Sequence, residues 1–556
     1  MAGGLFNLVS NGNANIILTG NPTKTFFKVT YSKYTNFGLQ KFRIDYEGSR
    51  DLRLTDDSVF QFKIKRYADL LMDTYLVINL PDIWSPIYHP CDSTNNSWVG
   101  YDFRWIKDIG IQMIRSIEIN CGSVLIQRYS GEYLLSMMER DFSREKKNLF
   151  HRMSGNDPEL NDPANAFGRK NTYPSSYYTN TSTGAEPSIR GRTLYIPINT
   201  WFSLDSRCAF PLICLQYNEL TISVTMRPIQ ELFQVRDVFD STYNYPYIQP
   251  DFTQEQFQMY RFLQTPPAIR IDSNAYANTI KTWNSDIHLI STYCFLSNEE
   301  SRKFAMEDQV YLVRDVYNYF FENITGNTRV KLLNSASMVS NWMFFFQRND
   351  VNMRNEWSNY TNWPYDSLPS NISTAPYTIV SPNNIFVNGE EIKNGPAINP
   401  DGYNTGIFST GDFSPYNRKE ILNSMGILLE GEYRENIIER GIYDYIEKYV
   451  RTEGFAREGI YCYNYCLNTS PFDYQPSGAI NMSKFKNIEL EISTYLPQVD
   501  NTSINNISCD DNGIPISIST KNSWQLFQYN FNMTLFEERY NILSFIGGNC
   551  GMMWAR

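Results

Sequence analysis

Apolar and polar residues alternate strictly in many short segments of the chain. In the segments 59–65, 220–227, 488–492 and 527–535, every second residue is apolar and its neighbours are polar. Side chains on a strand switch faces at every residue, so each segment predicts a strand with one buried face and one wet face. Strands of this kind belong to antiparallel sheets. Because the pattern recurs along the whole chain, it predicts an all-β protein.

Helical patterns are few and short. Ser297 followed by Glu300 forms a capping box, which predicts a helix of about two turns that reaches Met306. A second short helix is expected after Ser130, as far as Met138. A parallel α/β sheet would need a helical pattern after every strand, so these few helices favour a β-sandwich with decorated loops.

Three stretches rich in Asn, Pro, Gly, Ser and Tyr interrupt the strand pattern. We interpret the first, 141–192, and the third, 349–460, as loop insertions. The second reads as an interdomain connector, because strand patterns resume on both sides of it. The predicted organisation is an N-terminal segment 1–24, a first β unit 25–226, a connector 227–281 and a second β unit 282–556.

Composition narrows the class of protein. The chain has 556 residues, of which 42% are hydrophobic, 15% aromatic and 19% charged, and its net charge is -10. Such a chain folds, and its aromatic content suits half-buried strands. The chain is acidic and has no run of basic residues that could neutralise phosphates, so no direct nucleic-acid binding is expected. It has neither a signal-peptide pattern nor an apolar run long enough to cross a membrane, so we expect neither secretion by a signal peptide nor a helical anchor.

Residues that could support catalysis or metal binding are poorly placed. The nine cysteines are too sparse for a disulfide framework and indicate a reducing compartment. Cys462 and Cys466 have no second pair or nearby His, so a zinc site is not expected. His288 lies in a strand-like run and is interpreted as a structural histidine rather than a base. Glu489 and Glu491 share the wet face of one strand, whereas glycosidase carboxylates face each other across a cleft. We therefore predict a protein without catalysis, cofactor or metal.

Asn-x-Ser/Thr sequons recur along the chain, as its richness in Asn produces by chance. We take as candidate glycosylation sites Asn95, Asn180, Asn359, Asn371, Asn501 and Asn506.

Five segments resemble one known family, and they occur in the family's order. They are TFFKVTYSKYTNF at 25–37, FRWIKDIGIQMIRSIEINCGSVLIQRYSGEYL at 103–134, LYIPINTWFSLDSRCAFPLICLQYNEL at 194–220, NYCLNTSPFDYQPSGAINMSKF at 464–485, and the terminal FNMTLFEERYNILSFIGGNCGMMWA. The chain resembles the major capsid proteins of nucleocytoplasmic large DNA viruses, and the stretch 58–90 resembles their mimivirus-like branch. The resemblance spans both β units.

This resemblance implies a fold, a function and partners. The fold would be two consecutive eight-stranded antiparallel jelly rolls, with the third insertion added to an outward tower of loops. The function would be structural: three chains form a pseudo-hexagonal capsomer, and capsomers tile an icosahedral shell. The implied partners are further copies of the chain, minor capsid and penton proteins, and an internal viral membrane. The protein would be made in the host cytoplasm and located in the virion capsid.

Two questions stay open at this point. Apolar or turn residues that could contact a neighbouring chain, or equally pack inside their own sandwich, are Phe202, Phe210, Leu212, Tyr474 and Gln475. The alternatives to a major capsid protein are a minor capsid paralogue of the same virion and, more remotely, a β-sandwich carbohydrate-binding protein or enzyme. Copy number in the virion distinguishes a major capsid protein from a minor paralogue. A glycan array and a hydrolysis screen test whether the chain is a carbohydrate-binding protein or enzyme.

Overall fold

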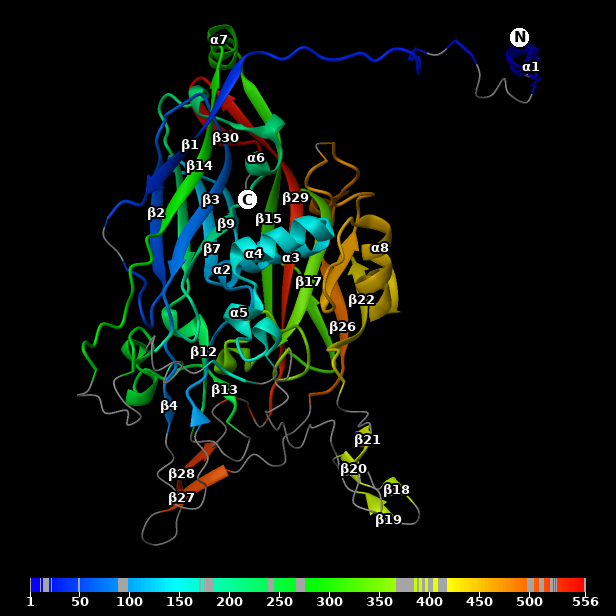
Figure 1. Cartoon of the computed structure of the whole chain (residues 1–556). Helices are drawn as coiled ribbons and strands as arrows, with labels where there is room; N and C mark the ends of the chain where they lie inside the picture. Colours follow the sequence, from blue (N-terminus) through cyan, green and yellow to red (C-terminus); the bar gives the residue numbers. More distant parts are fainter. Residues whose placement is uncertain are drawn as a thin grey trace.

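The structure is a computed structural model of the whole chain (Figure 1). It describes residues 2–554 except 11, 14–19, 22, 49–50, 89–98, 170–171, 175, 177–184, 239–244, 267–275, 367–384, 388–389, 393–395, 399–403, 409–417, 474, 498–504, 510–514, 521–523, 525 and 527. The sequons at Asn95, Asn180, Asn371 and Asn501 lie outside the described residues, as does Tyr474.

The first β unit is a sandwich of two antiparallel sheets. One sheet has the strand order β1-β14-β3-β10, with β9 paired to β3, and the other has the order β2-β11-β7-β8. The strands are β1 (Phe37–Asp45), β2 (Ser58–Ile64), β3 (Leu70–Leu80), β7 (Ile114–Cys121), β8 (Val124–Tyr129), β9 (Arg192–Pro197), β10 (Phe210–Pro211), β11 (Leu220–Met226) and β14 (His288–Leu296).

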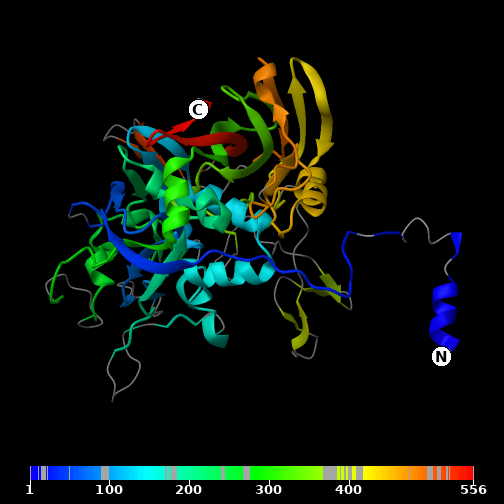
Figure 2. The same cartoon turned by 90° about the horizontal axis from the view of Figure 1, so that it is seen from above.

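The second β unit repeats this plan beside the first (Figures 1 and 2). Its sheets have the orders β15-β29-β17-β24, with β25 and β30 at the margins, and β16-β26-β22-β23. The strands are β15 (Gln309–Ile324), β16 (Asn327–Lys331), β17 (Met338–Arg348), β22 (Leu422–Leu429), β23 (Glu432–Glu439), β24 (Ile460–Asn464), β25 (Ile480–Asn481), β26 (Ile488–Thr494), β29 (Phe531–Ile546) and β30 (Asn549–Met552). The two sandwiches confirm the predicted all-β class.

Three of the four alternating segments form the strands that the pattern predicts. The fourth, 527–535, differs: β29 begins only at Phe531, and Thr534 is buried like its apolar neighbours. In β11, and in β2 from Phe60 onward, the apolar residues are buried and their neighbours are half-buried or exposed. The two strands pair directly, with Phe62 opposite Ile222 and Phe60 opposite Val224, so their apolar faces form one surface. In β26, Glu489 and Glu491 lie on the wetter face, as expected.

Both predicted helices are present. α3 (Gly131–Asp141) begins after Ser130, whose hydroxyl accepts a hydrogen bond from the Tyr133 amide. α7 covers Asn298–Met306, but the Ser297 side chain makes no capping hydrogen bond. The predicted helix is therefore correct, and the reciprocal capping box is not formed.

The boundary between the units differs from the predicted one. β14 was expected in the second unit, yet it pairs with β1 on one side and β3 on the other. The expected connector is also part of the first unit, because its strand β12 (Phe233–Arg236) pairs with β6 (Phe103–Trp105). Its apolar residues Ile229, Phe233 and Phe262 are buried in the common core. These residues contact the core from short turns and one short strand, and that arrangement leaves no periodic signal.

Two expected insertions contain ordered elements. The first holds α4 (Arg144–Ser154) and α5 (Pro158–Asn161), which bury Phe150 and Leu160. The third holds β22 and β23, which complete a sheet of the second sandwich, followed by the π-helix η10 (Ile442–Ile446) and α8 (Glu447–Arg451). The interpretation of 349–460 as an insertion throughout is therefore wrong for residues 422–451.

The remaining elements are short. They are α1 (Ala2–Val9), α2 (Ile109–Gln112), α6 (Trp201–Leu204), β4 (Ile87–Tyr88), β5 (Val99–Gly100), β13 (Tyr247–Ile248), β18 (Ile385–Val387), β19 (Glu390–Ile392), β20 (Pro396–Ile398), β21 (Asn404–Phe408), β27 (Asn505–Cys509), β28 (Pro515–Thr520) and single 3-10 turns at 166–168, 206–208, 212–214, 229–231, 255–257, 259–261, 351–354 and 482–484. None of the described helices is long and apolar enough to span a bilayer.

Candidate assembly site: the seam between the two sandwiches and the outer surfaces

The two sandwiches share one hydrophobic core across the surface where they meet, which we call the seam. The larger buried cluster contains the first unit's core together with residues of the second unit, including Val313, Met343 and Phe536, whereas a second cluster belongs to the second unit alone. β29 contributes to both clusters, because the sheet β15-β29-β17-β24 lies between them. The units are therefore packed like parts of one domain.

Aromatic pairs join the units at the seam. Phe210 of β10 meets Phe545 of β29 edge-to-face, with ring centroids 5.2 Å apart. Tyr133 of α3 meets Phe536 at 5.6 Å. Edge-to-face contacts of this kind add about 0.5–1.5 kcal/mol to the burial of each pair.

The predicted contact residues Phe202, Phe210 and Leu212 lie in this intramolecular core. They are 1%, 0% and 1% exposed, so they cannot touch a neighbouring chain while the protein is folded. Their assignment as contacts between chains is therefore corrected: Phe210 anchors one sandwich of the chain on the other. Gln475 is exposed, and its contact with another chain stays a prediction.

A buried ion network crosses the seam beside these rings. Arg140, at the end of α3, is 0% exposed. Its guanidinium donates to Asp141 at 2.7 Å, to Glu538 of β29 at 3.0 Å and to Asn341 of β17 at 2.6 Å. Asp141 also accepts a 2.6 Å hydrogen bond from the Thr469 hydroxyl. The cation of the first unit is thus shared between Asp141 of its own unit and two groups of the second.

The network fixes the charge states of its acids. Burial alone would raise the pKa of Glu538, but Arg140 and Arg314 outweigh it and hold this pKa below its usual range. For Asp141, burial prevails over Arg140, so its pKa is raised. A buried ion that loses its partner costs about 3–5 kcal/mol, so the network strongly penalises any separation of the two units.

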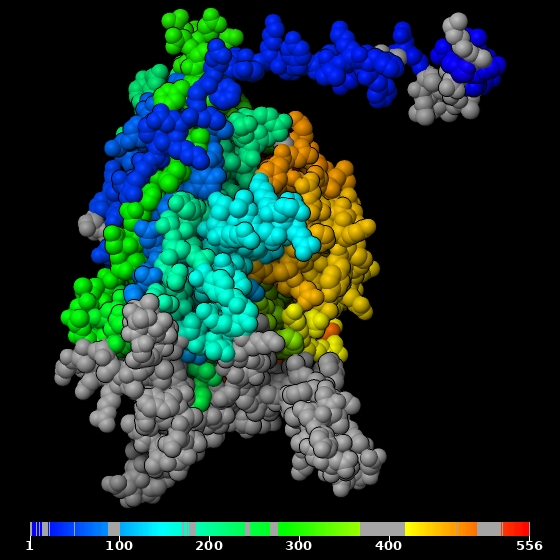
Figure 3. Space-filling view, in the orientation of Figure 1, coloured from blue at the N-terminus to red at the C-terminus, as the bar shows by residue number. Residues whose placement is uncertain are grey.

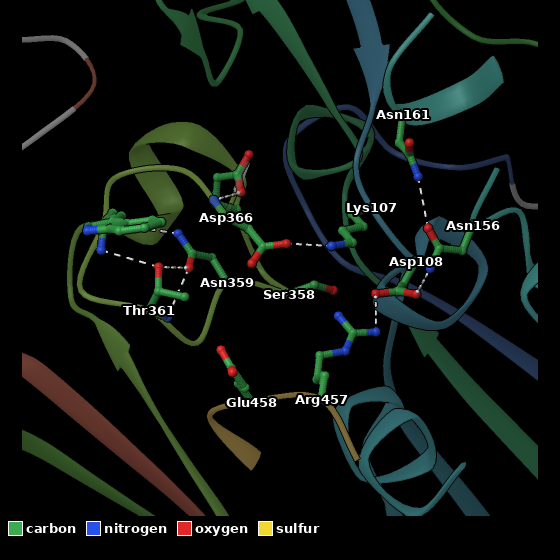
Figure 4. Close-up of polar contacts among 12 residues, drawn as sticks. Lys107, Asp108, Asn156, Asn161, Ser358, Asn359, Thr361, Asp366, Arg457 and Glu458 are labelled. Carbon is green, nitrogen blue, oxygen red and sulfur yellow. Dashed lines mark hydrogen bonds and ion pairs between the residues drawn. The ribbon is translucent and has the colours of Figure 1, made fainter. Parts of the chain in front are cut away.

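A second network closes the seam near α4 (Figure 4). Arg457 of the second unit donates to Asp108 at 3.0 Å and to Glu139 at 2.9 Å, both in the first unit. Asn156 donates to the other oxygen of Asp108 at 2.6 Å. Lys107 of the first unit pairs with Asp366 of the second unit across the seam.

His151 is attached to this second network. Its ring nitrogens lie 3.6 Å from Asp108 and 3.8 Å from Glu139. Burial lowers the pKa of His151 in spite of these two carboxylates, helped by Arg457 and Lys147. Burial would raise the pKa of Asp108, but Arg457 and His151 lower it further than burial raises it.

The chain backbone also approaches closely at the seam. The Gly454 amide donates to the Arg140 carbonyl at 2.8 Å. A Cβ atom at residue 454 would lie 2.5 Å from that carbonyl oxygen, a distance that real Cβ atoms essentially never show. Glycine is therefore required where the second unit rests on the end of α3.

One predicted glycosylation site is buried. Asn359 is 1% exposed, and its amide nitrogen donates to the Trp363 carbonyl at 2.9 Å. Its amide oxygen accepts from the Thr361 hydroxyl at 2.7 Å (Figure 4). This sequon forms a structural turn inside the fold, and the prediction of a glycan on Asn359 is corrected. Asn506 lies in β27, for which only the backbone is described.

The candidate chemical groups are separated and internally satisfied. Glu489 and Glu491 both pair with Arg329 of β16, at 3.6 and 3.0 Å. The His288 ring shares a 2.7 Å hydrogen bond with the Asp286 carbonyl. Cys462 and Cys466 are buried as free thiols. Among the described side chains, no group of three or more His, Cys, Asp and Glu could hold a metal ion.

Comparison with known proteins identifies the family. The family described as "Major capsid protein N-terminus" matches residues 25–289, and "Large eukaryotic DNA virus major capsid protein" matches residues 300–551. The chain belongs to the major capsid proteins of large eukaryotic DNA viruses. The two matched regions are separated by residues 290–299, which contain most of β14, the strand at which the observed first unit ends.

Similar capsid proteins span the whole chain. The major capsid protein of Phaeocystis pouchetii virus is 25% identical over 88% of this chain and 93% of its own length. That of Paramecium bursaria Chlorella virus 1 is 22% identical over 100% of both chains. "Capsid protein 1" of Acanthamoeba polyphaga mimivirus is 26% identical over 62% of this chain and 47% of its own.

Solved capsid proteins share the fold. The VP54 protein of the virus PBCV-1 matches with a TM-score of 0.59 and 18% identity, over 96% of this chain and 100% of that one. The Faustovirus major capsid protein matches with a TM-score of 0.57 and 11% identity, over 96% and 94%. The two sandwiches of this capsid protein are a double jelly roll, and its role is structural rather than enzymatic.

Proposed function

We propose that three copies of this capsid protein associate into a capsomer with a pseudo-sixfold outline, and that capsomers tile the icosahedral shell. The observation that carries the proposal is the seam. Each chain holds two similar sandwiches side by side through buried rings and ions, so three chains in a ring present six similar units. A closed ring of identical heterologous contacts needs no further component.

The proposal extends to partners and location. Minor capsid proteins, penton proteins and an internal viral membrane are the proposed neighbours in the virion, and the host cytoplasm is the proposed place of synthesis. The names of the similar proteins support the virion capsid as the location. The net charge of -10 favours a role that does not contact the genome directly.

Imaging tests the proposal. Purified full-length protein should form particles with a hexagonal outline in electron micrographs, each averaging to three copies of a double sandwich. The contacts between chains should bury more than about 2,000 Å² in total, as obligate interfaces do. Particles that contain a single double sandwich at every concentration would contradict it.

Copy number distinguishes a major from a minor capsid protein. We expect this chain to give the strongest band when the proteins of purified virions are separated and stained. A faint band beside a stronger paralogue would assign it the minor role.

A further inference from the structure

The residues before and within β1 form an exposed arm. Every residue from 23 to 41 is exposed, and the fully solvated side chains include Phe26 at 103%, Phe27 at 98% and Tyr31 at 88%. The chain leaves the body at the end where β1 begins and extends away from it (Figures 1 and 3). Exposed apolar side chains this close together mark an interaction segment.

The arm has the sequence of a strand. Phe27, Val29 and Tyr31 alternate with polar residues, so an extended chain places all three on one face. Thr, Val, Phe and Tyr, which favour strands, dominate the segment. The arm also continues directly into β1, which is itself a strand at the edge of its sheet. Residues 25–36 therefore have the pattern of a strand that lacks a sheet.

The arm is basic in an acidic protein. Residues 23–41 contain Lys24, Lys28, Lys33 and Lys41 and no Asp or Glu, whereas the whole chain carries a net charge of -10. The complementary partner for such an arm is an acidic strand at the edge of a sheet.

β23 offers such a surface. It is the last strand of the sheet β16-β26-β22-β23, so among the described strands it is paired on one side only. It contains Glu432, Glu435 and Glu439 against a single Arg. Tyr433 and Ile437, four residues apart on this strand, are 44% and 53% exposed.

Charge distinguishes β23 from other edge strands. β16, at the opposite edge of the same sheet, carries Arg329 and Lys331 and no acid. β2, at an edge in the first unit, carries Lys63 and no acid. Neither strand therefore contains an acidic side chain that could pair with the lysines of the arm.

Backbone hydrogen bonding favours a protein edge over a membrane surface. An extended segment inserted in lipid would leave its N–H and C=O groups unpaired, at a cost of several kcal/mol for each group. An edge strand supplies those partners, and alternate side chains then provide specificity.

We propose that residues 25–36 of one copy add as a strand to β23 of a neighbouring copy. Twelve extended residues span about 40 Å, and the eight residues of β23 span about 27 Å, which leaves about 13 Å of arm to cross between copies. The inference rests on the proposed self-association and assigns to it one contact between chains.

Cysteine cross-linking in full-length protein tests the contact. Thr30→Cys in the arm and Asn436→Cys on β23 are made in separate chains, which are mixed, assembled and mildly oxidised. We expect a disulfide-linked pair of chains in the mixture and at least tenfold less of it in either variant alone. Asn327→Cys on β16 is the matched control, an exposed residue at the opposite edge of the same sheet, and should give no more product than the single variants. Equal cross-linking to residues 327 and 436, or none to 436, overturns the proposal.

Charge reversal tests its electrostatic basis. Lys24→Glu with Lys28→Glu should reduce the yield of the 30–436 cross-link at least fivefold, and Glu432→Lys with Glu439→Lys in the other chain should restore it. A cross-link that is indifferent to these changes overturns the proposal. So does an arm whose lysines mediate binding to phosphatidylserine vesicles while no cross-link to β23 forms.

Sedimentation of the unsubstituted chain separates this inference from the proposed function. If the chain assembles and the cross-link is absent, only the arm contact falls. If the chain stays monomeric, the proposed function falls together with it.

Discussion

The seam and the outer face of the second sandwich use the same residue types in opposite ways. At the seam, Arg140 is fully buried and bonded to two carboxylates and an amide. On the outer face, Arg329 keeps 52% of its side chain exposed while it pairs with Glu489 and Glu491. Desolvation makes the first arrangement costly to break, and water makes the second weak.

The two regions therefore have different roles: the seam stabilises the single chain, and the outer face is available for contacts with other molecules. The buried seam holds two sandwiches as one unit, whereas the wet face and its edge strand keep charges and apolar side chains available for another molecule. A capsid protein needs both properties, because each subunit must hold its shape while its outer surfaces contact other subunits.

The largest expected effect is the loss of the seam cation. Arg140→Met should reduce the free energy of unfolding by about 3–5 kcal/mol, because it leaves Glu538 and Asp141 buried without their partner. Denaturant unfolding followed by tryptophan fluorescence measures the change. A loss below about 1 kcal/mol would show that the buried ion pairs of the seam contribute no more stability than the exposed pairs of the outer face.

A smaller loss should follow from filling the close approach at Gly454. Gly454→Ala should destabilise the protein by about 1–3 kcal/mol, because the new methyl group would overlap the Arg140 carbonyl. Gly441→Ala is the matched control: its φ is -58°, and its added Cβ would meet only the Tyr445 ring at 3.8 Å. Thermal unfolding should distinguish the two, and equal melting temperatures would show that the seam can relax.

The seam should also respond to pH through His151. Because its pKa is lowered in the folded protein, the unfolded chain binds this proton more readily, and stability falls as the pH drops below the ordinary value of 6.5. His151→Gln removes this titration, so its stability should change less between pH 7 and pH 5. The slope of the unfolding free energy against pH measures the effect. Equal slopes for the unsubstituted protein and His151→Gln would contradict the prediction.

The smallest effect should come from the outer face. Arg329→Met removes the partner of both Glu489 and Glu491, yet it should cost less than about 1 kcal/mol because all three side chains are partly exposed to water. The same denaturant series as for Arg140→Met gives the comparison. A cost above about 2 kcal/mol would show that the outer pairs behave as buried ones.

Sequence pattern predicted the half-buried strands and little of the seam. β2, β11 and β26 were recognisable because one face is apolar and the other is wetter. In β17 nearly every residue is buried, and its centre is the apolar run 342–346, which shows no alternation. β29, which lies between the two cores, is likewise buried on both faces for most of its length.

The buried network left one signal in the sequence. Glu537, Glu538 and Arg539 are the only charged residues in a strand of sixteen residues, and charges in such a place are paired when the strand is buried. Their partners are far away along the chain: Arg140 is 398 residues from Glu538. No local pattern connects such distant partners. For the same reason the sequence left open whether Phe202, Phe210 and Leu212 contact another chain or pack inside their own, and the structure places them in the interior.

The mass of the purified chain in solution tests the central claim most directly. If the seam makes each chain a unit whose outer surfaces join copies, sedimentation equilibrium should give a species of three times 64.8 kDa across a wide concentration range. A single species of 64.8 kDa at the highest concentration would contradict it.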